Sequence, residues 1–326
     1  MIRVATLLGL LGVALFTGLL IYQGVGQVGT VVLEAGFGLL WASLFHIVPM
    51  IVNAGAWRML FVAGPAPSLL QMTFAVWIRE SVNGLLPVAR IGGEVVSYRV
   101  LTRMGFRPAP VAASLIADIT LSMVSQFIFT IAGLVMLLLR IEDTAEVWRV
   151  IGGLMVFLPL VAGMIGLQRI GIVNLGARLV GMLFGERWSE LVGNAVRLDR
   201  VLRLVYRRMT RVVGSVFWQL VGWALGTGEV WLALQFLGHP IDLYDAFLLE
   251  AIAQAISSAA FVVPGAIGVQ EGGFMLFGTM LGLDPEVALA VAIARRIRDV
   301  IVFLPGLLVW QLSEAHKLVV RRTPAE

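Results

Sequence analysis

The chain has 326 residues, of which 59% are hydrophobic and only 13% are charged, with a formal net charge of +4. A soluble domain would carry about 25% charged residues. Apolar runs long enough to span a bilayer recur from end to end, so the sequence predicts a single all-α polytopic membrane domain over residues 1–326. This composition excludes most classes of cytosolic enzyme, and the absence of cysteine excludes disulfides and thiolate chemistry.

The sequence offers no metal or nucleotide site. The three histidines, His46, His239 and His316, are far apart and lack metal-ligand spacing. The segment Gly24–Gly29 has the form G-x-G-x-x-G, but its flanks are apolar runs typical of membrane helices rather than a strand and a crossover helix. We therefore expect no cofactor, no metal and no nucleic-acid partner.

About six apolar runs predict full transmembrane helices. The first follows Met1-Ile-Arg3 without a small-residue cleavage site, which favours an uncleaved helix over a signal peptide. The predicted spans are Val4–Tyr22, Val31–Asn53, Pro108–Leu139, Val150–Leu167, Val212–Leu237 and Glu286–Gln311.

Residues 67–108 predict a helical hairpin. Ser68–Leu86 is followed by a break containing Pro87, Gly92 and Gly93, and then by a helical piece of about 12 residues. That piece would be ~18 Å long, too short to cross ~30 Å of hydrocarbon. The pattern favours a re-entrant hairpin, although Ser68–Leu86 alone is long enough for a full span.

Residues 244–285 predict a second hairpin of the same kind. Its helix is broken at membrane depth by Pro264, Gly265, Gly268 and Gly272, and it carries a carboxylate at Glu271. Lipid does not tolerate exposed, broken backbone, because each unpaired polar group costs several kcal/mol there. The segment must therefore line a polar cavity or pack inside protein.

The two hairpins form an internal repeat. An offset of 177 places Pro87 on Pro264 and Glu94 on Glu271, with seven identities over the 28 positions from 81 to 108. Three predicted spans separate the copies, so they should enter the membrane from opposite sides. An inverted repeat of broken helices indicates the central site of a transporter. The alternative is a duplicated scaffold whose glycines only allow close packing.

Residues 169–211 predict a basic amphipathic segment in the membrane interface. It carries nine arginines, and its leucines recur at near-helical spacing. The arginines either contact anionic lipid headgroups or simply obey the positive-inside rule. With the basic tail and the arginines of the first hairpin, they place both termini in the cytoplasm.

Charged residues at membrane depth are the candidate functional groups. Arg90 lies four residues before Glu94 and would reach it on a helix. Glu271 has no such neighbour, so its cation should come from the last span. The candidates there are Arg295, Arg296, Arg298 and Asp299, with Arg295 and Asp299 on one helical face.

Further charges extend this set. Asp118 occupies the repeat position of Arg295 with the opposite sign, which suggests an Asp118–Arg295 pair near a pseudo-twofold axis. Arg79, Glu80 and Asn83 form either a structural ion pair or part of a substrate path. Glu229 and Glu250 are weaker intramembrane candidates, because no motif surrounds them.

Two motifs carry a family resemblance. Leu86–Glu94 with Arg99 places a proline and an arginine before Gly-Glu, and Val263–Gly273 with Arg295 or Arg296 downstream forms the second motif. Over about residues 10 to 312 the chain resembles the flippase-like membrane domain of lysylphosphatidylglycerol synthases. The second motif and the Leu304-Pro305-Gly306 ending look most like its hopanoid-biosynthesis-associated branch.

The resemblance implies a bacterial inner-membrane protein that moves a lipid, such as a hopanoid or a phospholipid, between leaflets. It carries Arg90, Glu94, Glu271 and Arg295 or Arg296 over as functional residues. We expect a lipid transporter rather than an enzyme. The alternatives are an intramembrane enzyme with Glu94 and Glu271 as acid and base, and a non-catalytic scaffold of a lipid-synthesis complex.

Overall fold

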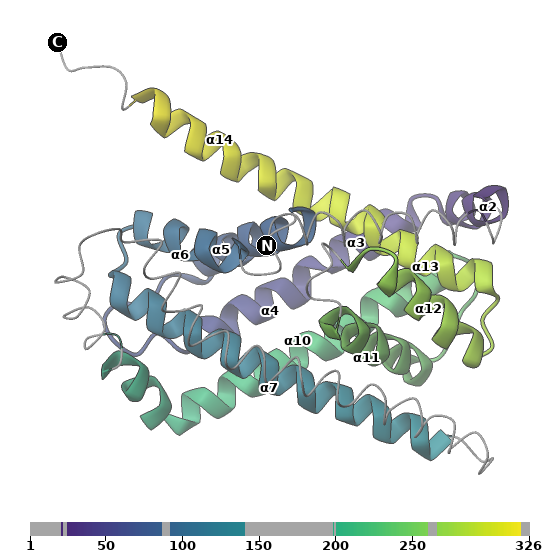
Figure 1. The fold of residues 1–326 in the computed structure, drawn as a ribbon, viewed down its shortest axis with the longest axis horizontal. Helices are drawn as coiled ribbons and strands as arrows, with labels where there is room; N and C mark the ends of the chain where they lie inside the picture. The colour runs from purple at the N-terminus through teal and green to yellow at the C-terminus, as the bar shows by residue number, and fades with distance from the viewer. Residues whose placement is uncertain are drawn as a thin grey trace.

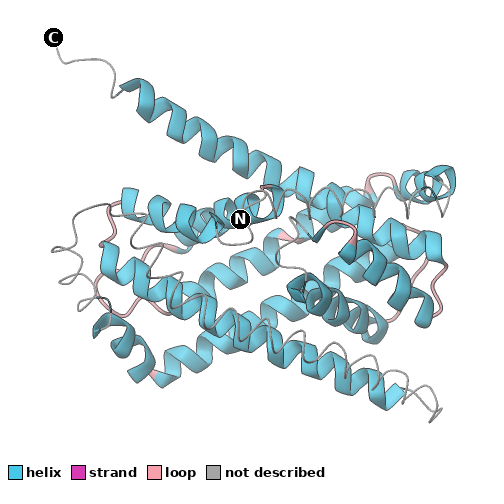
Figure 2. Cartoon of the chain, viewed as in Figure 1, coloured by secondary structure: helices cyan, strands magenta, loops and turns pink. Residues whose placement is uncertain are grey.

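The computed structural model describes residues 25–86, 92–140, 200–259 and 266–320, together with residues 21 and 198. Every regular element in these ranges is helical, which confirms the all-α class (Figure 2). In chain order the elements are α2 (Val25–Ala35), α3 (Gly38–Phe45), α4 (Ile47–Arg58), α5 (Leu69–Leu85), α6 (Gly92–Arg103), α7 (Pro108–Arg140), α10 (Met209–Phe236), α11 (Leu243–Ala259), α12 (Val269–Met280), α13 (Pro285–Arg298), the π-helical turn η2 (Asp299–Phe303) and α14 (Leu304–Val320).

Helix α10 connects the half of the molecule that holds the first hairpin (residues 67–108) to the half that holds the second hairpin (residues 244–285). It contacts α3, α4, α7, α11 and α13, while α14 extends away from the body (Figure 1). Glycines allow the close approaches, because a Cβ on Gly222 would collide with Asn53 of α4 and one on Gly228 would meet Phe45 of α3. Small residues bring helices together in this way inside membranes.

Two hydrophobic clusters form the core. One, with Leu234, Phe274 and Leu289, lies between α2, α3, the second half of α10, α11, α12 and α13. The other, with Trp57 and Leu101, lies between α4, α5, α6, α7 and the first half of α10. Each hairpin, α5–α6 and α11–α12, therefore packs in its own half of the molecule.

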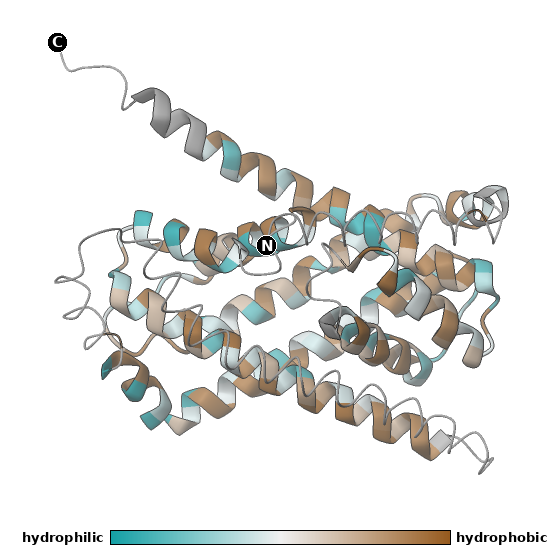
Figure 3. Cartoon of the chain, viewed as in Figure 1, coloured by the Kyte–Doolittle hydropathy of each residue, from teal (hydrophilic) through white to brown (hydrophobic). Residues whose placement is uncertain are grey.

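Large hydrophobic side chains are exposed on the outer surface, as expected for a surface that faces lipid. Large side chains of α7 are exposed at near-helical spacing, including Phe127, Ile131 and Val135, and Figure 3 shows hydrophobic stretches along α7 and α14. By length and composition, the two described stretches Gly38–Arg58 and Pro108–Leu139 qualify as candidate membrane spans.

The repeat offset relates helix bounds as well as residues. Adding 177 to the bounds of α6 gives those of α12, and adding it to the first residue of α7 gives that of α13. The ends of α6 and α12 also close alike, with glycines at φ 95° and 84° (Gly105 and Gly282). The bonds from Phe106 N to Leu101 O and from Leu283 N to Gly278 O occupy equivalent positions. These are αL helix ends that glycine adopts without a steric penalty.

Two predicted spans are not single α-helices. Val31–Asn53 is divided among α2, α3 and α4, and Gly36 at φ 49° lies in the first break. Glu286–Gln311 is interrupted by η2. Pro305 offers no N–H to the preceding turn, and the indole N–H of Trp77 donates to Val302 O at 2.7 Å, which satisfies a carbonyl in η2.

Several predictions lie outside the described residues. They include the spans Val4–Tyr22 and Val150–Leu167 and most of the basic segment at 169–211. Of that segment, residues 200–207 are helical, with Val205 buried and Arg200 exposed. The hinge and motif residues Pro87, Arg90, Pro264 and Gly265 are likewise outside.

Candidate functional site

The buried charges form two groups, one in each half. The first-repeat cluster consists of Arg79, Glu80, Asn83, Glu94, Asp118 and Gln219, and the second-repeat network consists of His46, Glu229, Glu250, Gln254, Gln270, Glu271, Arg295, Arg296, Arg298 and Asp299. Most of these side chains come from helices that pack against the two hairpins or belong to them.

The first-repeat cluster is built around Arg79 of α5. Its NH1 donates to Oδ2 of Asp118 on α7 at 2.7 Å, and Gln219 Nε2 of α10 donates to the other oxygen of Asp118 at 3.1 Å. The guanidinium lies 5.1 Å from the ring of the buried Trp57. The predicted Arg79–Glu80 pair is present at 3.6 Å, but Asp118 is the closer partner.

Asn83 holds the start of α6 against α5. Its amide nitrogen lies 3.2 Å from both oxygens of Glu94, and its carbonyl accepts the N–H of Gly93 at 2.8 Å. A Cβ on Gly93 would collide with the backbone carbonyl of Arg79, so α6 can approach α5 this closely only with glycine there. Gly92, the other predicted hinge residue, is the first residue of α6. Asn83 therefore fixes Glu94 at the helix N-terminus, where a carboxylate is favoured.

In the second-repeat network, each carboxylate oxygen of Glu271 has a hydrogen-bond partner. Its Oε2 accepts the N–H of Gly268 at 2.6 Å, which caps α12, and its Oε1 accepts from Nε of Arg296 at 2.7 Å. Gly268 has φ 80°, a conformation that favours glycine. Gly272, one residue further along α12, donates its N–H to Gly268 O at 3.1 Å. The last predicted span thus supplies the cation for Glu271, and that cation is Arg296.

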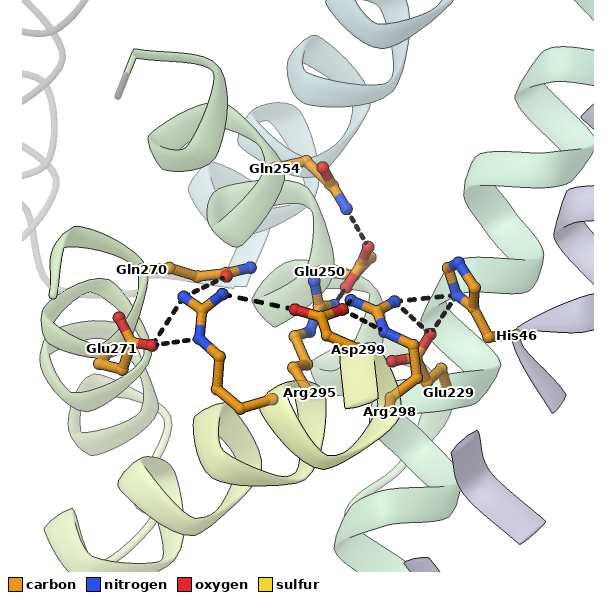
Figure 4. Close-up of polar contacts among 10 residues, drawn as sticks. His46, Glu229, Glu250, Gln254, Gln270, Glu271, Arg295, Arg298 and Asp299 are labelled. Atoms are coloured by element: carbon orange, nitrogen blue, oxygen red, sulfur yellow. Dashed lines mark hydrogen bonds and ion pairs between the residues drawn. The ribbon is translucent and has the colours of Figure 1, made fainter. Parts of the chain in front are cut away.

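Arg298 links α13 to α10 and to the α3–α4 junction (Figure 4). Its NH1 lies 3.1 Å from Oε2 of Glu229 and 2.9 Å from Nδ1 of His46, while its Nε donates to Oδ1 of Asp299 at 2.9 Å. His46 Nδ1 also lies 2.7 Å from Glu229. Asp299 further contacts Arg296 at 3.5 Å, so it lies between two arginines.

The predicted Asp118–Arg295 pair is wrong. Arg295 of α13 pairs with Glu250 of α11, and Asp118 pairs with Arg79. The two positions are repeat equivalents, but each side chain pairs with the first helix of the hairpin in its own half. Asp299, expected on one face with Arg295, makes its ion pairs with Arg296 and Arg298, at the point where the helix changes to π geometry.

The two ion pairs have opposite polarity. In the first half the cation is on α5 and the anion on α7, whereas in the second half the anion is on α11 and the cation on α13. The first-repeat cluster and the second-repeat network are also neighbours, because α5 packs against η2 and Glu80 lies within electrostatic range of Arg298. In all, three arginines and four carboxylates gather in the second-repeat network, where the cost of burying each charge is offset by its partners.

Several members of the site carry no sequence motif. His46, Gln219 and Gln254 lie outside both motifs, and no motif surrounds Glu229 and Glu250. Gln270 lies within the second motif. A signal exists, however, since amide and imidazole side chains are rare inside long apolar helices and bond to other helices there.

Comparison with known proteins identifies the fold family. The family described as the lysylphosphatidylglycerol synthase TM region matches residues 8–306 of the chain. No curated protein and no solved structure matches it.

Proposed function

We propose that this chain, which belongs to the lysylphosphatidylglycerol synthase TM-region family, moves a lipid between the leaflets of the bacterial inner membrane. Membership of this family implies a membrane protein with a lipid-related role. The transport activity is our proposal. The cargo we propose is a hopanoid or a related lipid, following the resemblance of the Val263–Gly273 motif and the Leu304-Pro305-Gly306 ending.

The observation that carries this proposal is the second-repeat network. Arginines of α13 and carboxylates of α10, α11 and α12 are buried together beside a broken hairpin, inside a protein with an apolar outer surface. Buried charges are expensive in a membrane and typically mark a substrate or ion path. A polar headgroup would exchange with these ion pairs while the apolar part of the lipid stays in the bilayer.

We further propose a topology with both termini in the cytoplasm, six full spans and two re-entrant hairpins that enter from opposite sides. The cysteine-free sequence allows a direct test. Single cysteines at the repeat-equivalent positions Arg103 and Met280 should react with a membrane-impermeant maleimide from opposite faces. Labelling of both from one face would refute the inverted arrangement.

Transport is tested by leaflet transfer of labelled hopanoid and phospholipid in proteoliposomes. We expect Glu271→Gln and Arg296→Gln each to lower the transfer rate at least tenfold, because each strands a buried partner. Glu286→Gln, at the first turn of α13, is the matched control and should transfer at the wild-type rate. Equal rates in all variants and in empty liposomes would refute the proposal.

Because the chain shows no nucleotide-binding motif, we propose that proton movement through Glu94 and Glu271 drives transport. Collapse of the proton gradient should then slow net transfer. If transfer is unchanged without the gradient, the coupling is wrong while facilitated transfer still stands.

The second candidate is an intramembrane enzyme acting on a lipid headgroup. It is favoured by the burial of Glu271 beside Arg296, since a carboxylate in such a site can act as a base. Chemical change of the labelled lipid during the transfer assay, detected by mass spectrometry, would support it. A scaffold, the third reading, would show neither leaflet transfer nor chemical change of the lipid, in the wild type as in Glu271→Gln.

A further inference from the structure

The junction of α3 and α4 brings an imidazole into the second-repeat network. His46 is the residue between these two helices. Its Nδ1 lies 2.7 Å from Oε2 of Glu229 on α10 and 2.9 Å from NH1 of Arg298 on α13 (Figure 4). The ring also packs against Phe303 of η2 in a T-shaped arrangement, with 5.5 Å between the ring centroids. Side chains of α10, α13 and η2 therefore hold the imidazole in one orientation.

One ring nitrogen of His46 faces both a donor and an acceptor. With a hydrogen, Nδ1 donates to Glu229, and with a lone pair it accepts from Arg298, but it cannot do both at once. The contact with Glu229 is the shorter one, and its length is that of a hydrogen bond to a carboxylate. Arg298 loses little without His46, because it also donates to Glu229 at 3.1 Å and to Asp299 at 2.9 Å. The geometry therefore favours a hydrogen on Nδ1.

The second nitrogen of the ring is left for a proton. When Nδ1 carries a hydrogen, the neutral ring has its lone pair on Nε2, and a proton there makes the imidazolium. Among the described residues Nε2 has no hydrogen-bond partner, and 19% of the His46 side chain is exposed. Histidine is the side chain whose charge ordinarily changes between about pH 5 and pH 8. A proton can therefore enter and leave at Nε2 without breaking the bond to Glu229.

The charges around His46 favour this proton. The second-repeat network holds three arginines and four carboxylates, so a protonated His46 balances the sum, whereas a neutral one leaves one negative charge in excess. Buried charge without a counterion is costly. Arg298 opposes the proton, and Glu229, which contacts both side chains, attracts it. The charged groups that the surrounding elements bring to this region are Glu229 of α10, Arg295 and Arg298 of α13, Asp299 of η2, Glu80 of α5, and the Arg79–Asp118 pair of α5 and α7.

We propose that His46 is the group at which the second-repeat network takes up and releases a proton during transport, with Nε2 carrying the proton and Glu229 stabilising the imidazolium. The proton comes from water and returns to water, so the Nε2–H bond is the one that forms and breaks. The inference rests on the proposed lipid transport and goes beyond it, because it adds to the proton movement a residue that lies in neither sequence motif.

Nuclear magnetic resonance of histidine tests the proton site without any transport. In the full chain with His239→Gln and His316→Gln, His46 is the single histidine, and labelled ring nitrogens report which of them is protonated. We expect Nδ1 to stay protonated and Nε2 to gain its proton between about pH 8 and pH 5. Glu229→Gln keeps an acceptor but removes the charge, so it should move this titration to lower pH, whereas Glu286→Gln at the first turn of α13 should not. A ring that keeps one charge over that range, or whose Nδ1 carries no hydrogen, would overturn the proposal.

His46→Asn connects the proton to transport. The asparagine amide nitrogen replaces Nδ1 as a donor to Glu229, but the variant has no counterpart of Nε2. In proteoliposomes we expect a proton gradient to accelerate lipid transfer by the wild type, and His46→Asn to respond about tenfold less and to lose the dependence on pH. His239→Asn, in the loop after α10, is the matched control and should behave as the wild type.

Two results for His46→Asn would contradict the role in transport. One is a wild-type pH profile with a wild-type response to the gradient. The other is a loss of transfer that is equal at every pH and with or without the gradient, which would make His46 a structural residue. The resonance experiment decides the proton site even if His46→Asn fails to fold.

The two experiments also separate this inference from the proposed function. A titrating His46 in a protein that transfers no lipid would keep the proton site and remove the transport. Lipid transfer by a protein whose His46 ring does not titrate would keep the transport and remove the proton site.

Discussion

The two halves of the molecule use one scaffold for two different charge arrangements. α6 and α12 have equivalent bounds and equivalent helix ends, and in both halves an ion pair joins the first helix of the hairpin to the helix that follows the hairpin. In the first half that pair is Arg79–Asp118, with the cation on the first helix of the hairpin. In the second half it is Glu250–Arg295, with the order of charges reversed, and Arg296 and Arg298 add further pairs.

In this repeat the backbone conformation is preserved more strictly than the positions of the charges. A helix end needs a glycine at a particular φ, so Gly105 and Gly282 are fixed by sterics. An ion pair needs only opposite signs on two facing helices. The repeat positions of Arg79 and Glu250 hold Ile256 and Thr73, so each half places its pair differently. We therefore propose that the Arg79–Asp118 pair of the first-repeat cluster is structural and that the lipid path follows the second-repeat network, while Glu94 keeps its proposed part in proton movement.

The largest effect should come from Arg298→Gln in the second-repeat network. It leaves Glu229 and Asp299 without a principal cation, and we expect a loss of about 3–5 kcal/mol in the free energy of unfolding. The measurement is unfolding by sodium dodecyl sulfate in mixed micelles. Arg99→Gln, on the exposed side of α6, is the control and should stay within about 0.5 kcal/mol.

Replacing the central arginine of the first-repeat cluster by glutamine should lower the free energy of unfolding somewhat less. Arg79→Gln strands Asp118, which keeps its bond from Gln219, so we expect a loss of about 3 kcal/mol. The double variant Arg79→Gln with Asp118→Asn should recover most of it, because the buried carboxylate is then neutral. No recovery in the same unfolding assay would show that Asp118 does not depend on Arg79.

Close packing of the first hairpin is tested by Gly93→Ala. The new methyl group would meet the carbonyl of Arg79 and the side chain of Asn83, and we expect a loss of about 1–3 kcal/mol. Gly29→Ala in α2 is the matched control, since its Cβ would meet nothing within 4 Å. If both alanines have equal effects on the unfolding midpoint, α6 does not need glycine to reach α5.

The π-helical turn is tested by Trp77→Phe. This change removes the hydrogen bond to Val302 O and should cost about 1 kcal/mol. In the second half the equivalent position is Gln254, which binds Glu250 instead. Trp218→Phe, at a half-exposed site on α10, should change the unfolding free energy less, and the reverse order would contradict the contact.

The smallest expected effect is the coupling between Asp118 and Arg295. These residues belong to separate ion pairs, so Asp118→Asn and Arg295→Gln should add to within about 0.5 kcal/mol in a double-mutant cycle. The Glu250→Gln and Arg295→Gln cycle should instead show strong coupling. Strong coupling of Asp118 to Arg295 would restore the pair that the sequence suggested.

Features that depend on local chemistry can be predicted from the sequence. Apolar content predicted an all-helical membrane protein. Glycines and prolines predicted the breaks between α5 and α6 and between α11 and α12, because their φ preferences act within a few residues, but the breaks at Gly36 and η2 were not predicted. The carboxylate at Glu271 and its need for an arginine of the last span also followed from the sequence, since a buried charge must be paired.

Which charges pair with one another depends on how the helices pack in three dimensions. The choice of Arg296 for Glu271, the pairing of Arg295 with Glu250 and the entry of His46 into the network depend on which helices cross and how far each side chain reaches. Asp118 and Arg295 occupy equivalent repeat positions and carry opposite charges, but they lie in different halves of the molecule and do not pair with each other. A sequence pattern fixes the face of a helix, but the partner across that face is set by packing that joins residues distant in the chain.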